Sequence, residues 1–156
     1  MSKRNCRHHS LSESGIQVGL GTDGCSSSND LNMWSVMRLA ALLIAQTQGA
    51  QRVDNSKIFE MATIGGAKSL GIDQITGSLE TGKSADIIAI DINRPHMIPI
   101  HDVFAQLIFA AGRDDVADVW VDGEQLIKDR KSTRIEFSNL KQEVAEIIAK
   151  LSTLEK

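Results

Sequence analysis

The sequence predicts an α/β protein, and three observations support this class. A short apolar run over residues 16–20 ends in an acidic turn, and apolar residues then recur at helical spacing over 30–47. Two β-rich runs, 85–91 and 116–127, come later in the chain. An apolar stripe over 140–154 is typical of an amphipathic helix. Strands and helices therefore share one chain of 156 residues, which is long enough for a domain with its own core.

Composition excludes several functional classes. The hydrophobic fraction of 42% and the charged fraction of 24% are those of a soluble globular protein. A net charge of −3 leaves no basic footprint, so nucleic acid is not an expected partner. No apolar run reaches the roughly 18 residues that a membrane span needs. Two cysteines, Cys6 and Cys25, are too few for a disulfide framework and favour a reducing cytoplasm.

Residues 1–14 form a polar leader without apolar periodicity. Cys6, His8 and His9 carry atoms that bind metals, but a structural zinc site needs four well-placed ligands. Neighbouring histidines in a polar tail are more often solvated. We therefore do not expect a metal site in the leader.

Residues 15–76 are predicted to hold one strand and two helices. The strand covers 16–22, where apolar residues alternate with small ones. After a polar loop, Asp30 is the expected N-cap of a helix over 30–47 that ends at Gly49.

The second helix begins near Asn55 and ends at Gly71, and it contains Gly65 and Gly66. Each interior glycine costs about 1 kcal/mol relative to alanine. The pair therefore predicts either close packing against a neighbouring element or a helix broken in two.

Residues 77–132 are predicted to be mainly strands. The strand over 85–91 is followed by a loop bracketed by two prolines and by a short helix that starts at His101-Asp102 and stops at Gly112. A β-hairpin with its turn at Asp122-Gly123 comes next. The last region, 133–156, is the amphipathic helix, for which Ser138 is the expected cap.

Asp23 is the candidate functional residue. It stands between glycines at the end of the predicted strand and ahead of a helix, which is how an α/β barrel presents a catalytic carboxylate. Aspartate and glycine also favour plain turns, and the tetrapeptide 21–24 by itself is more often a turn than a site.

Three runs resemble the metal-dependent amidohydrolase superfamily, in its branch of 5-methylthioadenosine/S-adenosylhomocysteine deaminases and chlorohydrolase-like enzymes. The run from Gly19 to Gly24, with the helix that follows it to Leu43, is similar to the last barrel strand and helix of that family. Residues 61–88 resemble the segment that leaves the barrel for an accessory β-sandwich, and 119–123 resemble the final hairpin of that sandwich. The resemblance covers residues 15 to 130 and implies a C-terminal fragment of a (β/α)₈ barrel, part of the β-sandwich and a terminal helix.

The resemblance implies a chemistry for Asp23. In the family, the aspartate at this position ligates a divalent metal, zinc or iron, and shuttles a proton. Metal-bound water has a pKa of about 7 and supplies hydroxide at neutral pH. Hydroxide attacks the ring carbon that bears an amino group, a carboxylate moves the proton, and ammonia leaves. A small-molecule substrate is therefore implied.

The sequence departs from the family pattern in its ligands and its length. A full barrel needs about 250 residues. The family's His-x-His pair is absent, because His8 and His9 are adjacent, and His96 and His101 fall in the accessory region as expected surface or capping residues. A catalytic zinc needs about three protein ligands. We therefore expect the chain alone to bind no catalytic metal and to be inactive. The alternative is a non-catalytic module that self-associates.

Self-association is expected for a structural reason as well. A strand over 16–22 without its barrel neighbours has two unpaired edges, and edges of this kind pair with other chains. The helix after it is expected to expose part of its stripe of Trp34, Met37 and Ile44. The sequence thus predicts a homo-oligomer.

Overall fold

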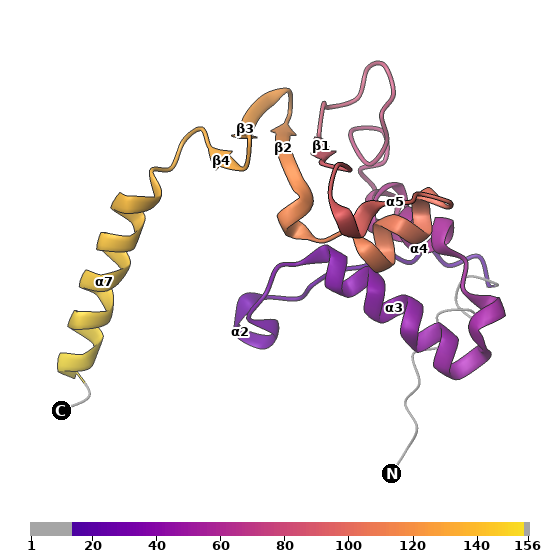
Figure 1. Ribbon diagram of the computed structural model, residues 1–156, viewed down its shortest axis with the longest axis horizontal. Helices are drawn as coiled ribbons and strands as arrows, with labels where there is room; N and C mark the ends of the chain where they lie inside the picture. The colour runs from indigo at the N-terminus through magenta and orange to yellow at the C-terminus, as the bar shows by residue number, and fades with distance from the viewer. Residues whose placement is uncertain (1–13, 155–156) are drawn as a thin grey trace, which may run out of the picture.

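The computed structural model describes residues 14–154, and it combines a helical body, a four-stranded sheet and a separate C-terminal helix (Figure 1). The polar leader with Cys6, His8 and His9 lies, apart from Ser14, outside the described residues. In chain order the elements are α2 (Cys25–Ser28), α3 (Met33–Gln48), η1 (Ala50–Arg52), α4 (Asn55–Ala62), α5 (Ile64–Leu70), β1 (Ile87–Ile90), η2 (Pro95–Met97), α6 (Val103–Ala105), η3 (Gln106–Ala110), η4 (Arg113–Asp115), β2 (Val116–Val121), β3 (Glu124–Lys128), β4 (Lys131–Ser132) and α7 (Phe137–Leu154).

The predicted strand over 16–22 is wrong. The segment carries no strand assignment and belongs to no sheet. A strand exists only where a neighbour completes its hydrogen-bond ladder, and between residues 14 and 154 no strand lies beside this segment. Instead, the N–H of Leu20 donates to the carbonyl oxygen of Met61 at 3.0 Å. The segment is therefore held to α4.

The helix after Asp23 forms, but three residues later than predicted. Asn32, rather than Asp30, is the N-cap of α3, and its side chain accepts a hydrogen bond from the N–H of Trp34. Asp30 instead accepts a hydrogen bond from the Arg113 guanidinium at 3.1 Å. The expected polar loop over 25–28 is the single helical turn α2. The end of α3 at Gly49 is confirmed.

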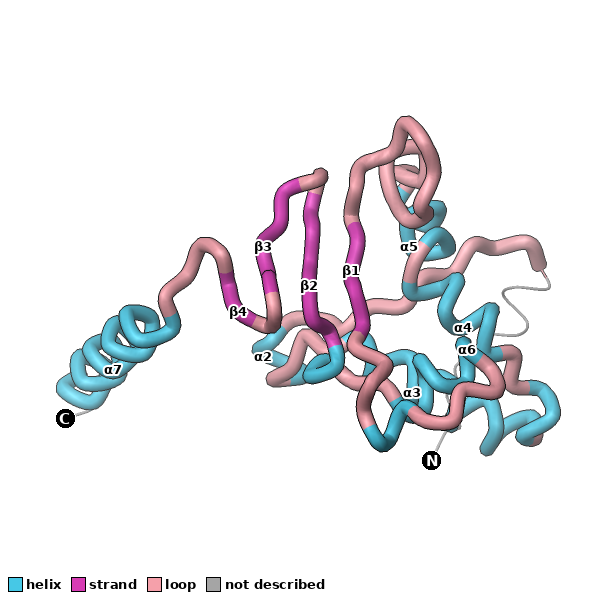
Figure 2. Tube along the Cα trace, turned by 45° about the horizontal axis from the view of Figure 1, so that its top comes forward, coloured by secondary structure: helices cyan, strands magenta, loops and turns pink. Residues whose placement is uncertain are grey.

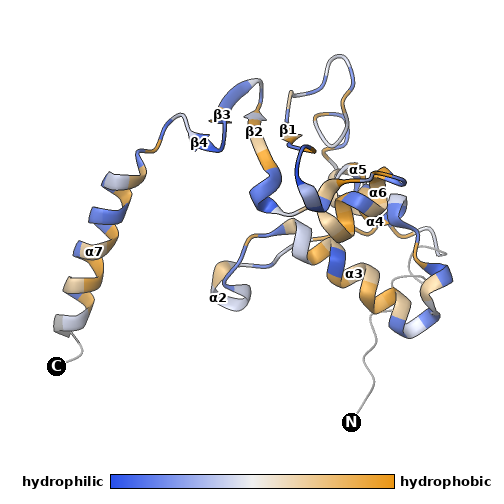
Figure 3. Cartoon of the chain, viewed as in Figure 1, coloured by the Kyte–Doolittle hydropathy of each residue, from blue (hydrophilic) through white to orange (hydrophobic). Residues whose placement is uncertain are grey.

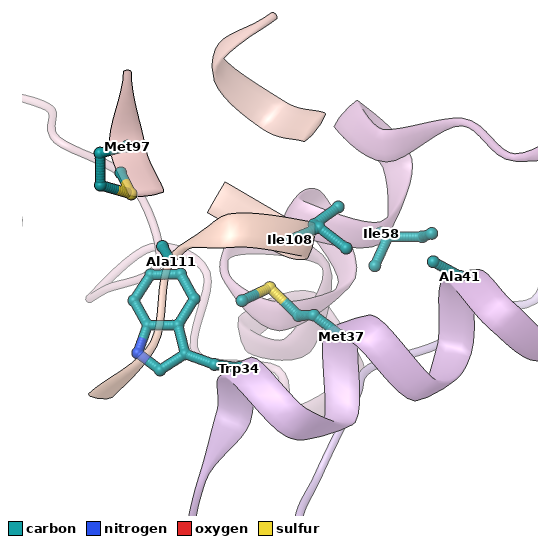
Figure 4. Packing of buried hydrophobic residues seen from close by; sticks show 7 residues of the cluster. All are labelled: Trp34, Met37, Ala41, Ile58, Met97, Ile108 and Ala111. Atoms are coloured by element: carbon teal, nitrogen blue, oxygen red, sulfur yellow. The ribbon is translucent and has the colours of Figure 1, made fainter. Parts of the chain in front are cut away.

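The core lies between α3, α4, η2 and η3, and it includes the face of α3 that was expected to be partly exposed (Figure 4). Trp34 and Met37 are only 7% and 3% exposed, and Ile44 packs against the same cluster. The predicted partial exposure is wrong for Trp34 and Met37, because η3 and η2 cover this face with Ile108 and Met97, whereas Ile44 is partly buried. The exposed apolar side chains of α3 are on another face and comprise Leu39, Leu42 and Leu43.

The glycine pair accompanies a broken helix, which was one of the two predicted outcomes. At Thr63 the backbone leaves the helical region, with φ −127° and ψ −109°, so α4 and α5 are separate helices. The other outcome, close packing, holds too. A Cβ on Gly19 would lie 2.9 Å from the Cα of Gly66, which fixes how closely the 16–22 segment approaches α5. Gly71 ends α5 in the left-handed region, as predicted.

The four strands form one antiparallel sheet in the order β1-β2-β3-β4 (Figure 2). Ile87 of β1 lies opposite Trp120 of β2, and the β2–β3 hairpin turns at Asp122-Gly123 as predicted. The expected short helix is also present: Asp102 is its N-cap, and it runs through α6 and η3. Residues 14–154 contribute a single sheet, not the two layers of a sandwich.

Helix α7 stands away from the body of the molecule (Figures 1 and 2). Each of its residues from Phe137 to Ser152 is exposed. Ser138 is inside the helix and donates to Glu136, so its expected role as the N-cap is wrong. Across the described chain, helices long and apolar enough to cross a membrane do not occur.

Candidate functional site

Asp23 lies on an exposed loop between the 16–22 segment and α2. Its φ of 61° is in the left-handed region, which aspartate tolerates better than most residues because its short side chain bonds locally. The carboxylate accepts a hydrogen bond from the N–H of Gly24 at 2.7 Å, and the Thr22 hydroxyl donates to the carbonyl oxygen of Asp23. These bonds fix the turn and direct the carboxylate along the start of α2.

The electrostatics keep Asp23 ionised. The N–H of Gly24, and after it the Ser27 side chain, stabilise the charged carboxyl and hold the pKa of Asp23 below its usual range. The side chain is therefore an anion at neutral pH. An exposed anion with fixed orientation can ligate a cation or accept a proton from an acidified water.

The structure does not bring other ligands to Asp23. Between residues 14 and 154, no group of three or more histidine, cysteine, aspartate or glutamate side chains is placed to hold a metal. Asp23 can supply one ligand, but a catalytic zinc needs about three. The described residues therefore do not fit a complete zinc site by themselves.

His96 has a partner that the sequence did not reveal. Its Nε2 lies 3.0 Å from Oδ2 of Asp115, whose side chain is only 6% exposed. His96 is a surface residue, as expected, with its side chain 49% exposed, and its imidazole also contacts a buried carboxylate. His101 is exposed, as expected. No local signal could have identified Asp115, since it stands in a charged run, Arg113-Asp114-Asp115.

A separate hollow of about 520 Å³ lies between the start of the 16–22 segment and the helices α3, α4 and α5. Ile16, Val18, Ile58 and Met61 contribute apolar lining, and charged residues of α4 and α5, including Lys57 and Lys68, are also part of its wall. Asp23 is not among the lining residues. The hollow and the candidate carboxylate are therefore distinct features.

Comparison with known proteins gives a consistent result. The sequence profile of the Amidohydrolase family matches residues 3–126. The 5-methylthioadenosine/S-adenosylhomocysteine deaminase of Teredinibacter turnerae is 38% identical over 152 residues, which is 97% of this chain and 34% of that enzyme. A crystal structure of an adenosine deaminase from Xanthomonas campestris with bound zinc aligns with a TM-score of 0.88 at 36% identity, covering 95% of this chain and 34% of that one.

A chlorohydrolase also matches. Atrazine chlorohydrolase from Arthrobacter aurescens, in complex with zinc, aligns with a TM-score of 0.77 at 27% identity, over 87% of this chain and 30% of that one. The chain thus spans about a third of the length of the proteins that it resembles. The zinc of these two structures belongs to proteins about three times as long.

Proposed function

Since the chain belongs to the amidohydrolase family, we propose that it supplies the C-terminal part of a hydrolytic deaminase that acts on an adenosine-type ring. The names of its relatives support this reaction class: the deaminases of Teredinibacter turnerae and Xanthomonas campestris are among them. The expected reaction is C–N hydrolysis with release of ammonia. The two cysteines, with Cys25 free and exposed, suit the reducing cytoplasm as its compartment.

The observation that carries the proposal is the geometry of Asp23. Its carboxylate is exposed, charged at neutral pH and fixed by the Gly24 N–H. A base whose pKa lies below the usual range takes a proton only from a strongly acidic donor, so Asp23 needs an activating group beside it. A divalent metal would acidify water when bound, but residues 14–154 offer no ligand set to hold one. We therefore infer that the chain alone is not catalytically competent.

A chimera tests the assignment. The matching third of the Teredinibacter turnerae deaminase is replaced by this chain, and ammonia release is measured with 5-methylthioadenosine, S-adenosylhomocysteine and adenosine. We expect the chimera to deaminate at least one of them and the isolated chain to deaminate none. In the chimera, Asp23→Asn should lower turnover by about a thousandfold or more, because the proton acceptor is lost.

Asp30→Asn, between α2 and α3, is the matched control. The Asp30 carboxylate is engaged by Arg113 and has no role in the proposed chemistry. We expect this variant to retain turnover close to that of the unmodified chimera. An Asp23→Asn chimera with normal zinc content and undiminished turnover would contradict the role of Asp23.

The second candidate function is a non-catalytic module that self-associates. Two exposed apolar faces favour it: Leu39, Leu42 and Leu43 on α3, and the stripe of α7. Contiguous apolar patches larger than a few hundred Å² are rare on soluble monomers. A metal-free, inactive oligomer, combined with a chimera that has no activity, would favour this candidate.

A further inference from the structure

The apolar residues of α7 follow a seven-residue repeat. Within the helix, apolar side chains recur at alternating spacings of three and four, at Phe137, Leu140, Val144, Ile147 and Leu151. These are the a and d positions of a heptad, the pattern that joins two helices along a shared seam. In the sequence Leu154 continues the repeat. We refer to these positions as the α7 seam.

The α7 seam has no partner within the described chain. Its side chains from Phe137 to Leu151 are between 42% and 74% exposed. Figure 3 shows apolar and polar residues on opposite sides of a helix that stands apart from the body. Most helices in proteins gain their stability by packing an amphipathic face, so we expect the apolar face of α7 to pack against a second surface.

From this repeat we propose that α7 pairs with α7 of a second copy of the chain, in antiparallel orientation. When Val144 of one helix lies beside Ile147 of the other, Leu140 lies beside Leu151, and the two helices overlap over the whole span of Phe137–Leu154. Each layer then holds one a and one d residue, as antiparallel helix pairs require.

The charges beside the seam select this orientation. Glu143 and Lys150 occupy the g positions, and in an antiparallel pair g faces g. Glu143 of each copy therefore lies near Lys150 of the other, which gives two attractive pairs per dimer. In a parallel pair Glu143 would instead face Ile148.

The interaction goes beyond the proposed deaminase function and is measured without any activity. Sedimentation equilibrium of the full chain should show a mass that rises with concentration from 17.0 kDa toward twice that value. Ile147→Glu places a charge in the middle of the seam and should raise the dissociation constant at least about tenfold. Ala149→Glu adds the same charge on the outer face of α7 and should leave the constant unchanged.

A charge exchange tests the orientation. Glu143→Lys and Lys150→Glu should each weaken self-association, because each creates two like-charge pairs. Mixed in equal amounts, the two variants should form a heterodimer, since every pair across the seam is again attractive. Circular dichroism of each variant establishes that α7 is still helical.

Three results would overturn the proposal. The unmodified chain could remain at 17.0 kDa at high concentration. Ile147→Glu and Ala149→Glu could weaken association equally. Alternatively, Leu42→Glu on the exposed face of α3 could dissociate the oligomer while Ile147→Glu does not, which would place the interface on α3.

Discussion

Nε2 of His96 lies 3.0 Å from Oδ2 of Asp115, and this pair joins the η2 turn to the η4 turn at the start of β2. Asp115 also accepts a hydrogen bond from the N–H of Gly112 at 2.9 Å. Its carbonyl oxygen accepts from the N–H of Asp91 at 2.8 Å, beyond the end of β1. One buried residue thus fixes where the sheet begins relative to the helical body.

Asp115→Asn should destabilise the protein. The amide keeps the shape of the side chain but loses the charge that attracts His96 and the Gly112 N–H, so we expect a loss of about 1–3 kcal/mol in the free energy of unfolding. Asp114→Asn is the matched control, because the Asp114 side chain is 98% exposed. Urea unfolding of both variants measures the difference, and equal losses would show that burial of Asp115 adds nothing.

Protonation of Asp115 should contribute to the loss of folding stability in acid. Burial raises the pKa of this carboxyl, but the bonds from His96 and the Gly112 N–H outweigh burial, so the pKa lies below its usual range. A carboxyl with a lowered folded pKa stabilises the native state above its unfolded pKa, and this contribution is lost as the pH falls through the folded value. The difference in melting temperature between the unmodified chain and Asp115→Asn should therefore shrink as the pH falls below about 5. A difference that is constant over this range would contradict the linkage.

Arg38 should contribute to stability through the end of η3. Its Nε donates to the carbonyl oxygen of Ile108 at 3.1 Å, and its Nη2 donates to that of Ala111 at 2.9 Å. The guanidinium cation therefore satisfies two carbonyl acceptors at the C-terminal end of η3, where a positive charge is favourable. Arg38→Met keeps the apolar stem but removes both donors, and it should cost about 1–3 kcal/mol. Arg52→Met, at an exposed position in η1, should change the unfolding free energy by about 0.5 kcal/mol or less. Chemical unfolding compares the two variants, and similar losses would mean that the two carbonyls are satisfied without Arg38.

Local signals predicted much of this fold. The Asp122-Gly123 turn places two residues in the left-handed region, and the flanking β-rich runs are the strands β2 and β3. The end of α3 at Gly49 is also as predicted, because glycine readily adopts the positive φ of 98° at this C-cap. These features depend on residues that are near one another in the chain.

What the sequence did not predict depends on distant contacts. Residues 16–22 could form a strand only beside a neighbouring strand. Instead, the N–H of Leu20 donates to the carbonyl oxygen of Met61, 41 residues away. Burial of Asp115 is decided by His96, in a different turn. For Asp23 the structure supplies an oriented anion, and its catalytic role stays a prediction.

The close approach of the 72–86 loop to α5 should make Gly77 sensitive to a single added methyl group. A Cβ on Gly77 would lie 2.7 Å from the Cβ of Ala67 and 2.9 Å from the Cα of Ile64, whereas a Cβ on Gly82 would meet nothing within 4 Å. Both glycines have φ of +94°, so alanine meets the same backbone strain, about 1 kcal/mol, at either position.

The difference between Gly77→Ala and Gly82→Ala therefore isolates the steric contact. Ala67 is buried and Ile64 begins α5, so neither can move without shifting the helix. Overpacking of this kind costs about 1–3 kcal/mol, and we expect the midpoint of urea unfolding to fall further for Gly77→Ala by that amount. If the two variants unfold at the same urea concentration, the loop does not press on α5 in solution, and the glycine is needed for its backbone angle alone.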